Sequence, residues 1–280
     1  MKRARIVAIL LCLLAGGLLG WWIHHHLAHP SSTVDLARPS PDWPLVPAPQ
    51  PLSEAPPRRL TKGWEAAAPG LAYQVREAGG GMTQLAAVRV DRDQYRVEVA
   101  DLTREGKTPQ TVRSLAAERG AVAAINGGYF DEHWQPLGVL IHAGRRTNPP
   151  FRKSGGFFCV VQGRAAIRRT EQGLPTGVTE ALQCQPRLVT GGQVLTGFKP
   201  GEHLRAAVGV TAAGEVVLAV TCRGELSLRD WARAMKALGC QDALNLDGGP
   251  SSQLYFHAGK TELDLPGAYG IPAALVVLPK

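Results

Sequence analysis

From about residue 63 to the C-terminus, short apolar runs alternate with polar turns that contain glycine, proline or aspartate. Runs of this length, rich in β-branched and aliphatic residues, are typical of β-strands. The pattern predicts strands at 84–90, 95–100, 122–125, 137–141, 157–161, 187–190, 206–210, 216–220, 243–246, 253–256 and 273–278. Asp91-Arg92-Asp93 joins the first two runs and predicts a hairpin between them.

Two further segments have apolar residues at the spacing of an amphipathic helix. The stronger one runs from Ser227 to Leu238, where Ser227 and Asp230 have capping-box spacing and Gly239 provides a stop. One face collects its apolar side chains, namely Leu228, Trp231, Ala232, Met235 and Leu238. The weaker helix opens at Thr108-Pro109 and stops at Gly120. This irregular order of elements predicts an α+β fold: a single domain with a large mixed, mostly antiparallel sheet and two or three helices.

Residues 1–25 have a different pattern, that of a membrane anchor or signal segment. Three basic residues, Lys2, Arg3 and Arg5, precede an uncharged apolar run at 6–23 that ends in Trp21-Trp22. A run of this length can span a bilayer as a helix, and the positive-inside rule then places the rest of the chain outside the cytoplasm. We expect a single-pass inner- or plasma-membrane protein with a periplasmic domain. A cleaved signal peptide and a secreted form are the alternative, although no small-x-small cleavage site follows the run.

Residues 26–62 hold most of the prolines and have little periodicity, which predicts a stiff linker before a folded domain at 63–280. The histidines at 24–26 and His29 are more typical of a solvated stretch than of a metal site. The domain is long enough to bury one substantial core.

Charge and cysteine content narrow the classes of partner. The formal net charge is +8, but the basic residues are scattered and lack the clustering of nucleic-acid-binding surfaces, so we expect no nucleic-acid partner. Outside the membrane segment the chain has an even number of cysteines, which in an oxidising compartment predicts disulfides. Neighbouring pairs, Cys159 with Cys184 and Cys222 with Cys240, are favoured among the three pairings. A Cys/His metal site is the alternative, without C-x-x-C spacing to support it.

Two glycine-containing segments carry the candidate chemistry. The first glycine motif is Asn-Gly-Gly-Tyr-Phe-Asp at 126–131, and the second is Asn-Leu-Asp-Gly-Gly-Pro-Ser-Ser at 245–252. Each includes or directly follows the end of an apolar run, so its polar side chains lie at the end of a strand. Glycine permits positive φ and close approach of a ligand to the backbone. An ordinary hairpin turn is the alternative for either motif alone. Together they predict that two strand ends meet at one polar site.

Within the second motif, Asp247 is the candidate catalytic carboxylate, and Ser251 and Ser252 supply hydroxyls beside it for an anion. Arg205 and Arg223 flank predicted strands, and each is either an ordinary surface charge or a bidentate phosphate clamp.

Within the first motif, Asn126 and Asp131 lie among aromatic residues, an arrangement that suits a sugar because its faces stack and its hydroxyls need partners. Asp131 fits a loop cap equally well. No G-x-S-x-G, Walker or H-E-x-x-H pattern is present.

These residues together resemble the phosphodiester glycosidase family, which is related to the enzyme that uncovers mannose 6-phosphate by removing N-acetylglucosamine. The resemblance rests on the first glycine motif, the run Arg205-Ala206-Ala207-Val208-Gly209, Arg223 and residues 238–252, and it covers roughly residues 80–279. The family usually has a third glycine where Pro250 stands. Proline stiffens that turn and removes a backbone donor.

The resemblance implies hydrolysis between a sugar anomeric carbon and a phosphodiester, with a sugar phosphodiester or envelope glycan as substrate. Asp247 is then expected to be the nucleophile or base, and Asn126 and Asp131 to hold sugar hydroxyls. One of the two arginines, with the two serines, is expected to hold the phosphate. The remaining expected substrate-binding residues are Gly127, Gly128, Tyr129, Gly248 and Gly249.

The sequence requires no cofactor and predicts no metal ligand set, although a divalent cation near Asp247 is compatible with it. Two other functions fit the same residues. One is a membrane-anchored glycan-binding module without catalysis, and the other is a phosphodiesterase that cuts the P–O bond.

Overall fold

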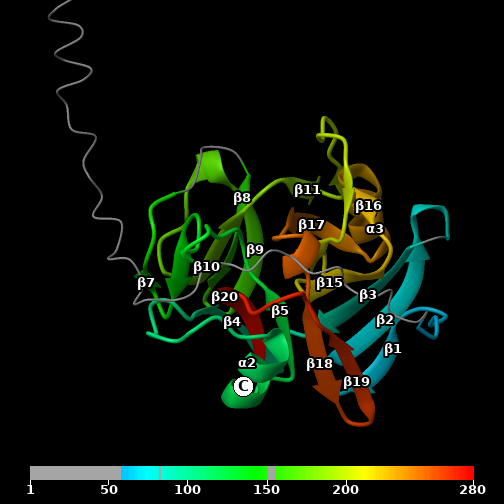
Figure 1. Cartoon of the computed structure of the whole chain (residues 1–280), viewed down its shortest axis with the longest axis horizontal. Helices are drawn as coiled ribbons and strands as arrows, with labels where there is room; N and C mark the ends of the chain where they lie inside the picture. The colour runs from blue at the N-terminus through cyan, green and yellow to red at the C-terminus, as the bar shows by residue number, and fades with distance from the viewer. Residues whose placement is uncertain (1–57, 82, 151–154) are drawn as a thin grey trace, which may run out of the picture. The chain divides into compact units, whose positions relative to one another are not determined.

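The chain folds mainly into β-strands, as the computed structural model of residues 58–280, apart from 82 and 151–154, shows (Figure 1). The largest sheet has the strand order β1-β2-β3-β15-β14-β17-β11-β12. In this order its strands are Glu65–Ala68, Leu71–Ala78, Thr83–Val90, Val216–Arg223, Ala206–Thr211, Cys240–Asn245, Arg187–Thr190 and Gln193–Val194. We call it the eight-stranded sheet.

Three smaller sheets complete the described fold. The β5 sheet, β19-β18-β5-β20-β4, contains Thr261–Leu265, Leu254–Ala258, Ala123–Asn126, Ala273–Pro279 and Tyr95–Asp101. The β10 sheet, β7-β6-β10-β8-β9, contains Arg145–Arg146, Leu140–His142, Val178–Cys184, Gly156–Val161 and Arg164–Arg169. β13 (Glu202–His203) pairs with β16 (Leu226–Ser227). Short 3-10 turns occupy Gly79–Gly81 (η1), Thr170–Gln172 (η2) and Gly249–Ser251 (η3).

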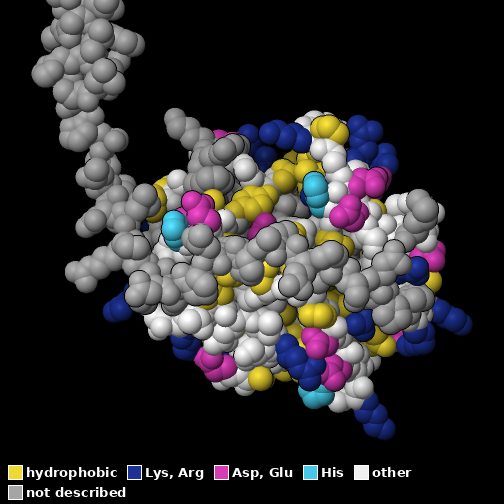
Figure 2. Space-filling model, in the orientation of Figure 1, with side chains coloured by type: hydrophobic (Ala, Val, Ile, Leu, Met, Phe, Trp, Pro, Cys, Tyr) yellow, Lys and Arg dark blue, Asp and Glu magenta, His cyan; other side chains and the backbone are white. Residues whose placement is uncertain are grey.

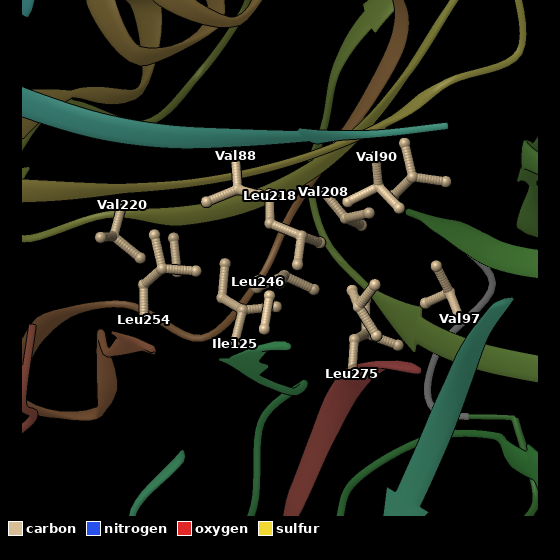
Figure 3. Packing of buried hydrophobic residues seen from close by; sticks show 14 of the residues in the cluster. Val88, Val90, Val97, Ile125, Val208, Leu218, Val220, Leu246, Leu254 and Leu275 are labelled. Atoms are coloured by element: carbon tan, nitrogen blue, oxygen red, sulfur yellow. The ribbon is translucent and has the colours of Figure 1, made fainter. Parts of the chain in front are cut away.

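One apolar core fills the space between the eight-stranded sheet and the β5 sheet. Figure 3 shows Val88, Val208 and Leu218 of the first sheet facing Ile125 and Leu275 of the second. Successive side chains of a strand point to opposite faces, so these strands also carry apolar residues on their outer faces. Both sheets are therefore buried on two sides, and each outer face needs a cover.

Two α-helices supply that cover. α3 (Leu228–Ala237) packs Trp231 and Met235 on the outer face of the eight-stranded sheet, and both side chains are fully buried. α2 (Val112–Arg119) packs Val112 and Leu115 on the outer face of the β5 sheet. Burying apolar side chains of this size contributes about 1.5–3 kcal/mol each.

The residues predicted to cap the helices do so in the structure. The Ser227 hydroxyl accepts from the Asp230 N–H at 3.1 Å, as the capping pattern predicts. Gly120 ends α2 with a φ of 63°. α2 begins four residues later than the predicted Thr108 opening, because Thr111 supplies the N-cap and accepts from the Ser114 N–H.

The strand positions are largely as predicted, but their pairing is not. β3 and β4 form no hairpin: β3 pairs with β2 and β15, whereas β4 pairs with β20 in another sheet. In place of one large mixed sheet the chain builds several, and every pairing among the described residues is antiparallel. The observed class is mostly β with two covering helices.

The predicted membrane helix at 6–23 and the linker at 26–62 lie outside the described residues, apart from the last few linker positions. Among the residues that the structure describes, no helix is both long and apolar enough to cross a membrane. The described residues belong to one unit, and the boundary at residue 63 stays a prediction.

The two predicted disulfides are wrong, since the four cysteines of the described chain are free. Cys159 pairs with Ala181 in the β10 sheet and Cys184 with Gly156, an offset of three residues that puts the thiols on opposite faces. Cys240 lies in β17 and pairs with Thr211 at one end of β14. Cys222 lies in β15, on the other side of β14 and beyond its opposite end. The second separation is about 20 Å along the strands, far beyond the roughly 6 Å between Cα atoms that a disulfide allows.

The basic residues are dispersed as the sequence indicates. On the face shown in Figure 2, Lys and Arg side chains lie at several separate places around the rim, with Asp and Glu side chains near several of them. Many pair with acids, for example Arg113 with Asp264 at 2.5 Å and Arg89 with Glu215 at 3.3 Å.

Candidate active site

The two glycine motifs meet where β5 and β17 end, and this confirms the central prediction from the sequence. Asn126, the last residue of β5, donates from Nδ2 to the Asp247 carbonyl oxygen at 2.8 Å. The Asp247 N–H donates to the Gly127 carbonyl oxygen at 3.1 Å. Because β5 and β17 belong to different sheets, these bonds join the two sheets at one corner. We call it the Asp247 corner.

Asn126 holds this corner together from inside. The residue is fully buried, and both ends of its amide have backbone partners: Nδ2 bonds the Asp247 carbonyl, and Oδ1 accepts from the Gln253 N–H at 3.1 Å. The expectation that Asn126 holds a sugar hydroxyl therefore does not match its geometry. Its side chain positions Asp247.

Three of the motif glycines are required by close backbone packing and not by positive φ. A Cβ on Gly127 would lie 2.7 Å from the Ala273 carbonyl oxygen, and one on Gly248 would lie 2.8 Å from the Leu204 carbonyl oxygen. At Gly128 the corresponding distance, to the Gln183 carbonyl oxygen, is 2.9 Å. Gly249 differs, since its φ of 57° is in the left-handed region. The first three bring protein backbones together and do not leave room for a ligand.

The Asp247 carboxyl has an unusual pKa for its type. It is partly exposed yet closely surrounded by protein, and this desolvation raises its pKa to about 6. Hydrogen bonds from the Ser251 hydroxyl and from the Gly248 N–H, 3.0 Å from Oδ1, act in the opposite direction. Because desolvation dominates, the carboxyl keeps its proton to a higher pH than an ordinary aspartate, which suits a general base that works near neutral pH.

The Tyr129 hydroxyl lies among the polar groups of the corner. It donates to the Gln185 carbonyl oxygen at 2.7 Å. Burial raises the pKa of this phenol far above its usual range, and the Asp247 charge adds to the shift. A hydrogen bond from Asn245 and the Arg205 charge oppose it. These interactions place an amide, a carboxylate and a guanidinium near one phenol oxygen.

Arg205 is a buried cation without an acidic partner within the described part of the chain. Its Nε donates to the Leu226 carbonyl at 2.8 Å and its Nη2 to the Gly201 carbonyl at 2.9 Å. Burial lowers the pKa of the guanidinium, which Tyr129 and Glu225 partly offset, but no carboxylate comes within ion-pair distance. A buried cation held only by carbonyls suits an anionic ligand.

Arg223 has a different environment from Arg205. It is exposed at the end of β15, where its backbone pairs with Gln84. No hydrogen bond or ion pair found among the described residues links it to the Asp247 corner. The surface-charge alternative is the one that its position favours.

Asp131 caps its own loop. Its Oδ1 accepts from the backbone N–H groups of His133 and Gln135, both at 2.9 Å. The neighbouring aromatic rings pack on one another: Phe130 stacks on Trp134 with ring centroids 5.4 Å apart, and Tyr269 meets both edge-on. Of the two alternatives that the sequence left open, the loop cap is the one observed.

The two serines of the second motif have different surroundings. The Ser251 hydroxyl bonds the Asp247 carboxylate, whereas Ser252 Oγ has no partner among the described residues, and both side chains are buried. The described residues include no group of three or more His, Cys, Asp or Glu side chains placed to hold a metal ion.

Comparison with known proteins identifies the family. The family model for phosphodiester glycosidases matches residues 119–278, a span that contains both glycine motifs and Arg205. The chain belongs to the phosphodiester glycosidase family. No curated protein sequence gave a match.

Solved structures share the fold of this family member. The catalytic domain of zebrafish N-acetylglucosamine-1-phosphodiester alpha-N-acetylglucosaminidase, auto-inhibited by its pro-peptide, is 18% identical. The match has a TM-score of 0.59 and covers 78% of this chain and 86% of the zebrafish one. A protein from Synechocystis is 17% identical, with a TM-score of 0.55 over 81% of this chain and 64% of the other.

In this phosphodiester glycosidase family member, sequence reasoning missed three residues of the corner. Gln253 is fully buried and links the Asp247 corner to α2, because its Oε1 accepts from the Val112 N–H at 2.9 Å. The sequence indicates Asn245 only as the start of a motif. Cys184, for which the sequence predicts a disulfide, has a thiol near enough to Asp247 that burial and this charge together raise its pKa to about 12. The signal available in the sequence was a polar residue at the end of an apolar run.

Proposed function

We propose that this protein hydrolyses the bond between the anomeric carbon of a sugar and a phosphodiester. One observation carries the proposal: the Asp247 carboxyl, with its pKa raised to about 6, and the Arg205 guanidinium, which has no acidic partner among the described residues, both lie close enough to the Tyr129 hydroxyl to affect its pKa. A carboxylate and a cation within reach of one phenol fit a substrate whose reacting carbon carries an anionic leaving group. Membership of the phosphodiester glycosidase family supports the same chemistry.

In this reaction the bond between the anomeric carbon and the bridging oxygen breaks, and its electron pair goes to the phosphate oxygen. Water supplies the hydroxyl that ends on the sugar, and its other proton ends on the phosphate monoester or in solvent. Asp247 directs the attack, either as nucleophile or as base for the water, and the configuration of the first-formed sugar distinguishes the two. Arg205 stabilises the departing phosphate.

Arg205 is the proposed phosphate ligand because two of its donors are fixed by carbonyls and its remaining N–H groups have no protein acceptor in the described structure. Asn126 and Ser251 have a supporting role, since the first holds the Asp247 backbone and the second bonds its carboxylate. The substrate would come from an envelope glycan or glycoconjugate.

The proposed location is outside the cytoplasm, with residues 6–23 as the membrane anchor. The charge and hydropathy pattern of the N-terminus supports it. Protease added to spheroplasts should digest the domain while the inner membrane is intact. Full protection until the membrane is lysed would contradict this location.

The test of the activity uses the purified full-length protein and a panel of sugar-1-phosphodiesters. N-acetylglucosamine-1-phosphodiester is a sensible first compound, given the name of the zebrafish enzyme. We expect release of free sugar and of a phosphate monoester, with oxygen from labelled water on the sugar. Label on the phosphate would instead indicate P–O cleavage, and binding without any product would indicate a glycan-binding module.

Two variants connect the activity to the site. Asp247→Asn keeps the size of the side chain and an acceptor for the Gly248 N–H but should abolish turnover. Asp93→Asn is the matched control, because Asp93 is 83% exposed on a distant turn, and it should retain full activity. Unchanged turnover in Asp247→Asn would refute the assigned role.

A further inference from the structure

Inside the Asp247 corner lies a buried acceptor that has no partner in the described structure. Asn245, the last residue of β17, is only 3% exposed. Its Nδ2 donates to the carbonyl oxygens of Gln185 at 3.2 Å and Leu246 at 2.6 Å. Its Oδ1 has no hydrogen-bond partner in the part of the chain that the structure describes. Since both neighbours are carbonyls, which only accept, the NH2 group must face them and the oxygen must face elsewhere.

Asn245 lies beside the reactive carboxylate. The Tyr129 hydroxyl and Asn245 Nδ2 both donate to the Gln185 carbonyl oxygen, at 2.7 and 3.2 Å, and the charges of Asp247 and Arg205 both affect the Tyr129 pKa. Asn245 and Asp247 are also two residues apart at the end of an extended segment, so their side chains leave the backbone on the same side. Oδ1 is therefore an acceptor within the candidate active site.

A buried acceptor without a donor is rare in proteins, because its lost hydrogen bonds to water are not replaced. Its partner must come from outside the protein, as an ordered water or a ligand, and in a candidate active site a bound ligand can supply it. The ionised phosphate of a diester carries only acceptors, so it cannot satisfy Oδ1. A sugar hydroxyl can, since it donates.

We propose that Asn245 Oδ1 accepts a hydrogen bond from a ring hydroxyl of the sugar whose anomeric carbon faces Asp247. This inference rests on the proposed function and divides the site into a phosphate side at Arg205 and a sugar side at Asn245. Asn245 thereby determines sugar specificity: an analogue that lacks this hydroxyl leaves Oδ1 buried and unpaired, and a site of this kind rejects it strongly.

The test compares the best sugar phosphodiester substrate with its monodeoxy analogues. Wild-type enzyme should lose at least about 100-fold in kcat/KM for one analogue. Two variants then isolate Oδ1, because both lose the Nδ2 donors but only one keeps an acceptor. Asn245→Asp should still prefer the hydroxylated substrate by more than about tenfold, whereas Asn245→Ala should treat the pair alike within about threefold.

The ratio between the two substrates is the readout, so a general loss of stability or of phosphate affinity cancels. If Asn245→Ala does not fold, Asn245→Leu removes the acceptor and keeps the side-chain shape. Equal use of all analogues by wild type, or wild-type discrimination in Asn245→Ala, would overturn the proposal while the hydrolytic function stands. Absence of turnover on every sugar phosphodiester would contradict the proposed function and this inference with it.

Discussion

Replacing Asp247 by asparagine should make the fold more stable at neutral pH while it removes activity. The wild-type carboxyl has a pKa of about 6 in the folded protein against 3.8 for an ordinary aspartate. Below about pH 4 it is protonated in both folded and unfolded chains and makes no difference. Between about pH 4 and 6 the unfolded chain releases its proton first, so the folded state loses stability as pH rises.

The size of this loss follows from the shift. About two pKa units at 1.36 kcal/mol each give roughly 3 kcal/mol above pH 6, an upper limit because the carboxylate is partly exposed to solvent. Asp247→Asn introduces a neutral amide, which avoids the cost of desolvating a charge and still accepts from the Gly248 N–H. We expect the variant to gain about 1–3 kcal/mol at pH 7.5, about a third of that at pH 4.5 and almost nothing at pH 3.

Urea unfolding of wild type and variant at several pH values measures this difference directly. Other titrating groups affect both proteins alike, so the difference in unfolding free energy isolates Asp247. Asp93→Asn, an exposed site, should show no such pH dependence. A difference that does not change with pH, or a variant that is less stable than wild type at pH 7.5, would refute the reasoning from desolvation.

Three further predictions concern activity and packing. In a pH–rate profile, kcat/KM for hydrolysis should rise with pH through an apparent pKa of about 6, because Asp247 acts as a carboxylate. A fall through the same range would mean that the acid form of Asp247 is required. Gly127→Ala should destabilise the protein by about 1–3 kcal/mol in thermal or urea unfolding, because its Cβ would lie 2.7 Å from the Ala273 carbonyl oxygen. Gly63→Ala is the control and should be close to neutral, because its Cβ would have no atom within 4 Å. Arg205→Lys should raise KM at least about tenfold, since lysine keeps the charge and loses the guanidinium fork; an unchanged KM would remove Arg205 from phosphate binding.

Local features of the fold were predictable because they depend on neighbouring residues. The capping hydroxyl of Ser227 and the left-handed stop at Gly120 act within one turn of helix, and both are observed. Strand pairing was not predictable, because an apolar run such as β4 does not show which of many other runs it will meet. β10 escaped detection altogether. Its Glu180 is buried, yet it accepts from the Val99 and Ala143 N–H groups, so tertiary partners replace the missing apolar pattern.

In the candidate site, too, some features were predictable from the sequence and others were not. The sequence indicated that the glycine motifs would meet, because two such motifs at strand ends are explained together by one shared polar site. It could not distinguish a ligand contact from a structural contact. Asn126 and Asp131 both satisfy backbone groups, whereas Asn245 retains an oxygen that has no partner among the described residues. That difference depends on which backbone lies opposite each side chain, and only the folded chain decides it.

The position of Asp247 between two sheets has a consequence for how activity is acquired. One half of the corner comes from β5 and the other from β17, so a chain in which either sheet has formed alone has no assembled catalytic group. Enzyme activity should therefore return last during refolding, after the secondary structure. A fragment that carries only one of the two glycine motifs should be inert, however well it folds.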